Sequence, residues 1–191
     1  MPAADRRRAI LDVVVPLLVE KGSALTTAEV ARAAGIAEGT IFRVFPDKCA
    51  LIYEAVKATM DPAPVADAIR AIGPSAPMAV QLGEAVRVLR DHFNRMTALG
   101  DSLRSVSALP GAQKRDVGRL IKESSSVISA ALAELFERHR AALRVPPATA
   151  TAAFRGLVFA SAHPLLPPRE RLAMEETVSI LLSGIAKHEG T

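Results

Sequence analysis

A turn glycine with small and apolar residues at fixed distances on either side constrains the fold of this chain more than any other feature. Counted from Gly35, these residues lie five, four and one positions before it and one, six and nine positions after it: Val30, Ala31, Ala34, Ile36, Ile41 and Val44. Two short helices that cross steeply need a small residue at the crossing, a glycine in the turn and a shared apolar side. The spacing therefore predicts a helix-turn-helix over residues 26–45, with an ordinary helical hairpin as the alternative.

The remainder of the sequence also has the apolar spacing of helices, and it lacks the alternation that is typical of strands. Proline and glycine divide it into segments. We expect an all-α fold, with a kink where Pro16 interrupts the first helix. The predicted helices cover residues 5–21, 28–34, 38–45, 46–60 (or as far as 72), 78–99, 101–109, 113–143, 148–162 and 169–188.

The content of reactive residues argues against an enzyme. The chain has one cysteine and four histidines, and no histidine has another His or Cys at metal-ligand spacing. A glycine-rich phosphate loop, a serine nucleophile elbow and a paired-carboxylate motif are all absent from the sequence. We therefore expect no catalytic residues, no metal and no cofactor.

The charge balance permits nucleic-acid binding without requiring it. The whole chain carries a formal net charge of +4, from 24 basic and 20 acidic residues. Residues 1–57 contain eight basic and seven acidic residues, a net charge of only +1. If this segment binds DNA, it does so by the placement of its charges and not by their sum. No apolar run approaches the ~18 residues that a membrane-spanning helix needs, and no secretory signal is evident, so we expect a cytoplasmic protein.

The first third of the chain resembles a known family. The residues that carry the resemblance are Thr26-Thr27, the Ala34-Gly35 turn, Gly39-Thr40, Phe42-Arg43, Phe45 and Lys48. This pattern resembles the N-terminal domain of TetR-family transcriptional regulators over about residues 9–56. The resemblance implies a helix-turn-helix DNA-binding domain over residues 1–47 and a helical domain for ligand binding and dimerisation over residues 48–191. It also implies a DNA operator and a small-molecule effector as partners.

The resemblance assigns roles to individual residues of the DNA-binding domain. Thr27 is implied to contact phosphate at a helix start, Thr40 and Arg43 to face the major groove, and Lys48 to approach a phosphate. Arg43 has the geometry to pair with a guanine edge. The other predicted members of the interface are Glu38, Gly39 and Phe42.

Several of these positions leave alternatives open. Phe42 and Val44 stand where the family commonly has residues that can donate a hydrogen bond. Glu38 either stabilises a helix start or accepts from cytosine N4, and the first of these is favoured. The run Arg6-Arg7-Arg8 is either a flexible arm that reaches DNA or a solvated charge run.

The C-terminal two thirds predict a pocket and a dimer interface. We place an apolar effector, neutral or anionic, among His92, Phe93, Met96, Phe154 and Phe159. The last predicted helix has an apolar stripe of Met174, Val178, Leu181 and Ile185, and each of the last two helices is apolar on more than one face. We therefore expect them to form a four-helix interface with a second copy.

The sequence thus predicts a ligand-responsive repressor that a small molecule releases from a palindromic operator. Two alternatives remain: a helical interaction or ligand-binding protein with degenerate DNA binding, and a redox sensor through Cys49, which follows Lys48 near a helix start. A lone cysteine is more often a small apolar residue.

Overall fold

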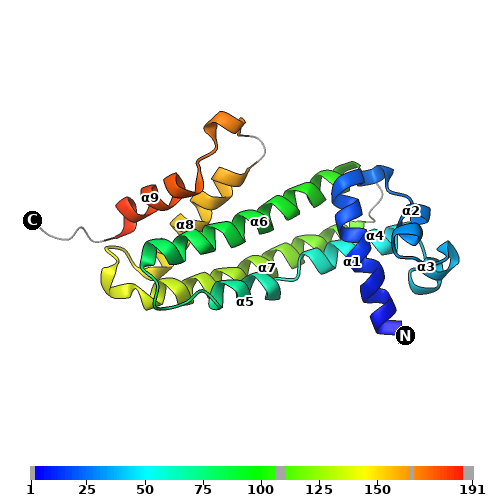
Figure 1. Ribbon diagram of the computed structural model, residues 1–191, viewed down its shortest axis with the longest axis horizontal. Coiled ribbons are helices and arrows are strands. Elements are labelled where there is room, and N and C mark those ends of the chain that lie inside the picture. The colour runs from blue at the N-terminus through cyan, green and yellow to red at the C-terminus, as the bar shows by residue number, and fades with distance from the viewer. Residues whose placement is uncertain (1–2, 106–110, 164–165, 187–191) are drawn as a thin grey trace, which may run out of the picture. The chain divides into compact units, whose positions relative to one another are not determined.

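The computed structural model describes residues 3–105, 111–163 and 166–186 of the 191-residue chain (Figure 1). Among these residues, the extended pairing is one isolated antiparallel bridge between Leu143 and Ala186. The prediction of an all-α fold is therefore confirmed. The α-helices are α1 (Ala3–Lys21), α2 (Thr27–Ala33), α3 (Glu38–Val44), α4 (Lys48–Thr59), α5 (Ala63–Arg70), α6 (Met78–Ser105), α7 (Gly111–Arg138), α8 (Pro147–Ala162) and α9 (Met174–Ile185); the short 3-10 turns are η1 (Gly22–Ala24), η2 (Arg140–Ala142) and η3 (Pro168–Glu170).

Several predicted helix boundaries were wrong, and most of the errors lie near proline or glycine. The fourth helix begins at Lys48 after the cap Asp47, and Pro62 caps a separate α5, since proline favours the start of a helix over its interior. Helix α6 runs through Gly100 to Ser105, because one glycine costs a long helix only about 1 kcal/mol. Residues 106–109 of the predicted helix over 101–109 lie outside the described residues.

The C-terminal boundaries also differ from the prediction. Helix α7 ends at Arg138, and the 3-10 turn η2 covers part of the segment predicted to continue it. Helix α9 begins at Met174 and not at residue 169, because the turn η3 follows the prolines there. Residues 187–188, the end of the predicted last helix, lie outside the described residues. Helix α1 continues through Pro16.

The first compact unit combines residues 1–61 with residues 95–122. Helix α1 packs against both α2 and α4, and α2 packs against α3. Met96 of α6 and Val117 of α7 pack against the same core. This core fixes the helix-turn-helix on α1 and α4; its largest fully buried side chains are Ile10, Leu18, Leu25, Ile41, Phe45, Leu51 and Ile52.

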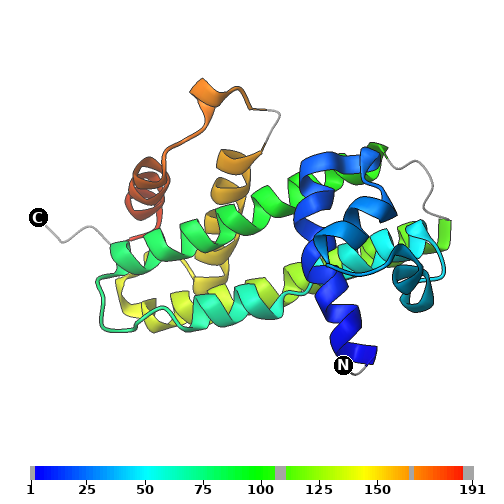
Figure 2. The ribbon, with the colours of Figure 1, turned by 45° about the vertical axis from the view of Figure 1, so that its right-hand side comes forward.

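The second compact unit combines residues 62–94 with residues 123–191. Helix α5 lies beside α7 in both ribbon views (Figures 1 and 2), and Arg70 Nε donates to Glu134 Oε2 at 3.0 Å. Phe136 of α7 meets Phe154 of α8 edge to face, with ring centroids 5.7 Å apart. Helix α8 packs against α9, whose buried side chains complete this core.

The two units are defined by packing, which does not reveal which residues bind DNA or ligand. The division into a DNA-binding domain over 1–47 and a ligand and dimerisation domain over 48–191 therefore stays a prediction. Among the described residues, no helix is both long and apolar enough to cross a membrane.

Candidate nucleic-acid interface

Helix α2 begins with a reciprocal cap. Glu29 N donates to Thr26 Oγ1 at 3.2 Å, and Thr26 N donates to Glu29 Oε2 at 3.0 Å. The Lys21 ammonium lies 2.6 Å from Glu29 Oε1. The Lys21 hydrogen bond and then the two Thr26 bonds lower the pKa of Glu29 from 4.5 to about 2. The end of α1 is thus tied to the first turn of the helix-turn-helix.

This carboxylate makes the stability of the unit depend on pH. The folded pKa of Glu29 lies below the unfolded one, so its contribution is present above pH 4.5 and is lost as pH falls toward about 2. In Glu29→Gln we expect a smaller loss of unfolding free energy between pH 5 and pH 3 than in the unmodified chain. Urea unfolding at both pH values measures it. An equal loss of unfolding free energy in the two proteins would show that the ionised Glu29 carboxylate does not contribute to stability.

The turn between α2 and α3 requires its glycine for conformation and not for space. Gly35 has φ +66°, a left-handed value that side chains rarely adopt, while a Cβ placed there would meet nothing within 4 Å. Ile36 N donates to Ala31 O at 3.0 Å and closes the turn. The predicted contacts Val30, Ala31 and Ile41 are all buried. The helix-turn-helix prediction is therefore confirmed over the ordinary helical hairpin.

Helix α3 buries one side and exposes the residues that were predicted to read DNA. Ile41 is 1% exposed and anchors the helix, whereas Phe42 is 47% exposed. Glu38, Gly39 and Arg43 are exposed, and Thr40 is half-buried. Within the described part of the chain, no hydrogen bond or ion pair holds Arg43, so its guanidinium is available to a partner.

Thr27 and Glu38 are joined to each other across the turn. Thr27 is the first residue of α2, and its Oγ1 donates to Glu38 Oε1 at 2.6 Å. The bond connects the two helices of the motif, while the cap of α2 is Thr26 and that of α3 is Ala37, which makes no side-chain bond. Glu38 therefore accepts from a neighbouring helix in this state and does not cap its own.

Lys48, the remaining residue predicted to contact DNA, lies at the start of α4. Asp47 caps the helix by accepting from Ala50 N at 2.7 Å. Lys48, the first residue of α4, and Cys49 after it are both half-buried. Phe42 on α3 has an exposed ring without a hydroxyl, so it cannot donate the hydrogen bond to phosphate that the resemblance would place at this position.

The arginine run is part of α1, which excludes the flexible arm, one of the two alternatives for these residues. Arg7 Nη2 lies 2.8 Å from Glu54 Oε2, and its guanidinium lies 4.8 Å from the centre of the Phe45 ring. Arg7 thereby links α1 to α4 and to the residue that follows α3. Arg8 is exposed on the same helix.

Sequence reasoning missed the contact between α4 and α7. The Tyr53 hydroxyl donates to the carboxylate of Asp116, which Arg119 also contacts. The hydrogen bond to Asp116 raises the pKa of Tyr53 to about 12, while Tyr53 and then Arg119 lower the pKa of Asp116. The two partners are 63 positions apart, and no periodic pattern in the sequence could pair them.

The five residues predicted to line a pocket do not form one cluster. Phe93 meets Phe159 edge to face at 5.4 Å, and buried His92 lies beside Phe93. Phe154 is fully buried against Phe136, and Met96 packs against the core of the first unit. Among the described residues, no three His, Cys, Asp or Glu side chains gather in a way that could hold a metal ion.

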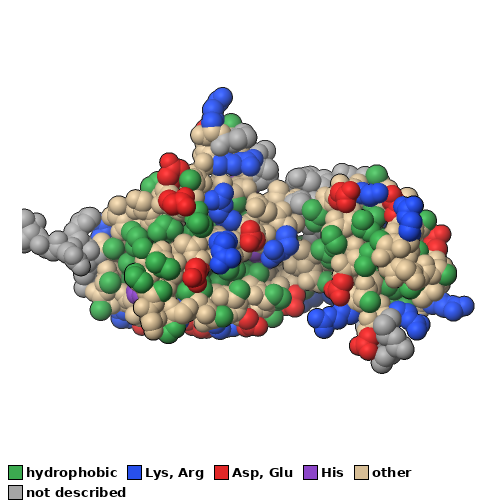
Figure 3. All heavy atoms as spheres, viewed as in Figure 1, with side chains coloured by type: hydrophobic (Ala, Val, Ile, Leu, Met, Phe, Trp, Pro, Cys, Tyr) green, Lys and Arg blue, Asp and Glu red, His purple; other side chains and the backbone are tan. Residues whose placement is uncertain are grey.

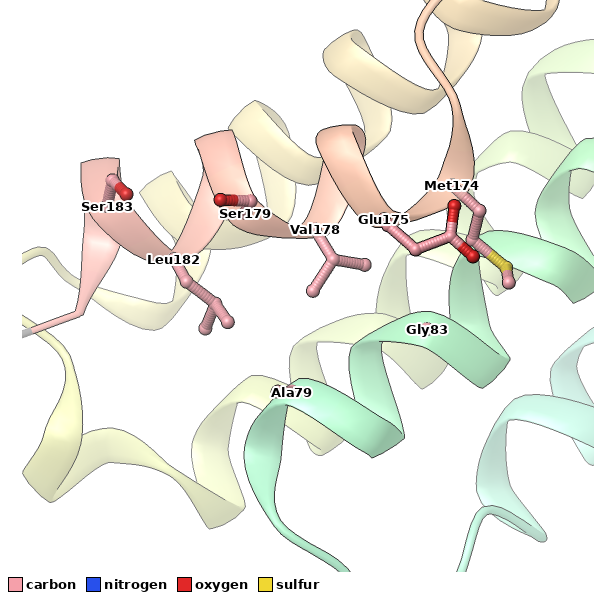
Figure 4. A pocket seen from close by; sticks show the side chains of 8 residues that line it. All are labelled: Ala79, Gly83, Met174, Glu175, Val178, Ser179, Leu182 and Ser183. Atoms are coloured by element: carbon pink, nitrogen blue, oxygen red, sulfur yellow. The ribbon is translucent and has the colours of Figure 1, made fainter.

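Two grooves of the second unit involve other residues. One, of about 420 Å³, lies between α6 and α9, where Val178 and Leu182 point toward Ala79 and Gly83 (Figure 4). The other, of about 360 Å³, lies between α7 and α8 and includes Arg155. Sequence reasoning missed Arg155 because an isolated arginine in a helix carries no motif.

The apolar stripe of α9 covers the core of its own unit, and the four-helix interface of the last two helices with a second copy stays a prediction. Val178, Leu181 and Ile185 are each at most 9% exposed. Among the described residues, the large apolar side chains exposed on the last two helices are Phe159 on α8 and Ile180 on α9, each 50% exposed. Phe159 and Ile180 are therefore the candidate apolar contacts for an interface on these helices.

Comparison with known proteins adds a family to this geometry. Residues 10–55 match the family described as bacterial regulatory proteins, tetR family. A TetR transcriptional regulator from Streptomyces coelicolor is 27% identical and superposes with a TM-score of 0.62, covering 94% of this chain and 98% of that one. A putative TetR-family regulator from Mesorhizobium loti is 20% identical, with a TM-score of 0.70 and coverage of 98% and 100%.

The fold also occurs in a protein with a different name, the superantigen PfiT, at 18% identity, a TM-score of 0.65 and coverage of 99% and 100%. At that identity the likeness shows the fold alone. The family is carried instead by the match over residues 10–55, which spans the confirmed helix-turn-helix and most of α4. Over residues 10–55 the chain therefore matches the tetR family of bacterial regulatory proteins, and over nearly its whole length it has the fold of TetR-family regulators.

Proposed function

We propose that this protein is a homodimeric repressor that a small-molecule effector releases from a palindromic DNA operator. The observation that carries the proposal is the exposed side of α3, where Arg43 extends from a helix that Ile41 anchors in the core. A second helix of a helix-turn-helix held in this way can enter the major groove and present a guanidinium to a guanine edge.

The electrostatics favour specific placement over a general attraction to DNA. Basic and acidic side chains are mixed over the visible face of the first unit (Figure 3), in agreement with the small net charge of residues 1–57. Each favourable phosphate contact therefore matters, and the carboxylate of Glu38, the first residue of the recognition helix α3, disfavours binding to DNA that is independent of sequence.

Selection of operator sequences from random duplex DNA, followed by footprinting, tests the proposal. Two recognition helices related by a two-fold axis protect half-sites about one helical turn, ~34–36 Å, apart. We expect one palindromic footprint that weakens steeply as salt rises. A failure to select any duplex at low salt would leave the interaction protein with degenerate DNA binding as the function.

Lys48 supplies the matching prediction for phosphate contact. Lys48→Ala is expected to weaken specific and random duplexes alike and to lower the slope of log Kd against log salt by about one per subunit, because one counterion fewer is released. Fluorescence anisotropy at four salt concentrations measures the slope. Lys122→Ala, which removes an exposed lysine of α7, is the control and should leave the slope unchanged.

Release by an effector requires a ligand that binds one conformation more tightly than another. The α6/α9 and α7/α8 grooves are two candidate binding places, and both lie in the second unit. In this mechanism an occupied groove favours a conformation in which the two recognition helices of the dimer no longer match successive turns of the major groove.

A further inference from the structure

Arg155 of α8 is a partly buried cation whose partners within the described residues are neutral. Its Nη2 donates to Ser125 Oγ at 2.6 Å, and its Nη1 donates to Ser129 Oγ. Both serines belong to α7, one turn apart. The guanidinium is therefore held in place by hydroxyl groups that contribute no negative charge.

The contrast with other arginines of the same unit is informative. Glu134 raises the pKa of Arg70 and Glu137 raises that of Arg140, whereas burial alone lowers the pKa of Arg155. The Nε of Arg155 is buried and has no hydrogen-bond partner in the described part of the chain. An arginine that loses water without gaining a carboxylate is costly, so the arrangement favours binding of an anion.

The space beside Arg155 has the size and surface of a small ligand site. The α7/α8 groove measures about 360 Å³, and its other lining residues are Ser129, Ala130, Ala133, Ala148, Thr151 and Ala152. Thr151 Oγ1 already donates to Pro147 O at 2.8 Å. The lining therefore offers small apolar surfaces and one positive charge.

We propose that the α7/α8 groove binds a small molecule with a carboxylate head and a short apolar body, and that Arg155 pairs with the carboxylate. A planar guanidinium matches a carboxylate in a forked pair, and the alanines accommodate the apolar body. The inference deepens the proposed function, because such a molecule is the expected effector class. Binding itself does not require that the protein bind DNA.

The probes are hexanoate and hexan-1-ol, which share an apolar body and differ in charge. Titration calorimetry of the full chain is expected to show hexanoate binding at least about tenfold more tightly than the alcohol, since charge-assisted bonds exceed neutral ones by that much. Added salt should weaken the binding of hexanoate and leave that of hexanol nearly unchanged. Equal affinities for the two probes, or no binding of hexanoate, would overturn the proposal.

Three variants assign the site. Arg155→Met keeps the apolar stem and should lose the preference for hexanoate, while Ala152→Phe keeps the charge, fills the groove and should weaken both probes. Arg169→Met removes an arginine whose side chain is 83% exposed and should change nothing. Thermal unfolding of each variant verifies that it is folded. Unchanged hexanoate binding in both folded groove variants would place the ligand elsewhere.

The other source of a carboxylate is a glutamate of a second copy of the chain. In that case Arg155→Met would dissociate the dimer in sedimentation velocity, and the unmodified chain would not bind hexanoate, which would overturn the proposal. Hexanoate that binds through Arg155 without changing operator affinity would leave the site standing and contradict only its role as an effector site. Failure of the binding site and failure of its role in releasing DNA therefore give different results.

Discussion

Arg43→Ala is expected to abolish most of the preference for the operator while leaving the fold intact. A bidentate contact to a guanine edge contributes roughly 1–3 kcal/mol, and a dimer on a palindrome loses two of them. The affinity for the operator should therefore fall by about 30-fold or more. The side chain is exposed and unsupported by described residues, so the unfolding free energy should change by less than about 0.5 kcal/mol.

The measurement compares operator and random duplex in the same anisotropy assay. Arg43→Lys keeps the charge and loses the fork, so it should recover binding to random DNA but little of the preference. Arg87→Ala, which removes an exposed arginine of α6 in the second unit, controls for net charge and should be neutral. Operator binding by Arg43→Ala within threefold of the unmodified chain would show that α3 does not read the bases as proposed.

The sequence predicts the helix-turn-helix well because all its determinants lie within twenty residues. Gly35 must adopt a positive φ, and Val30, Ala31 and Ile41 must share one side, so a linear pattern contains the whole motif. The same locality places the end of α1 at Lys21. Such short-range requirements can be read directly from the order of residues.

The site residues in the second unit could not be predicted in the same way. Arg155 meets Ser125 and Ser129, which lie 30 and 26 positions away, and their contact depends on how α7 packs against α8. The predicted pocket grouped residues by chemical type, yet Phe154 lies in the core and Met96 packs in the first unit. An apolar stripe shows that a helix is buried on one side but not what covers it, so the sequence could not assign the α9 stripe to the core of one copy or to an interface.

Ile180→Glu is expected to convert a dimer into a folded monomer that no longer binds the operator. Ile180 is 50% exposed on α9, and Phe159 is exposed to the same extent on the adjacent α8. A two-fold axis through these helices would bring a substituted glutamate of each copy into a desolvated surface, where unpaired charge is costly. Because a single recognition helix offers few base contacts, operator affinity should fall by at least about 100-fold.

Its neighbour Leu181 supplies the matched contrast. Leu181 is 4% exposed and belongs to the core of the second unit, so Leu181→Ala should cost roughly 2–5 kcal/mol of unfolding free energy through the cavity it leaves. Ile180→Glu should change that free energy of the isolated unit far less, since its side chain leaves water only at an interface. Substitution of Leu181 thus tests the stability of the unit, and substitution of its neighbour Ile180 tests dimerisation.

Sedimentation velocity at micromolar concentration, with urea unfolding of the same samples, distinguishes the outcomes. An unmodified chain that sediments as a monomer, or an Ile180→Glu protein that remains a dimer, would show that α8 and α9 do not form the proposed interface. A monomeric Ile180→Glu protein that still binds the palindrome with full affinity would show instead that one recognition helix suffices. The expected result joins both properties: the substitution that separates the subunits also removes the operator footprint, because only a fixed spacing lets two α3 helices enter successive major grooves.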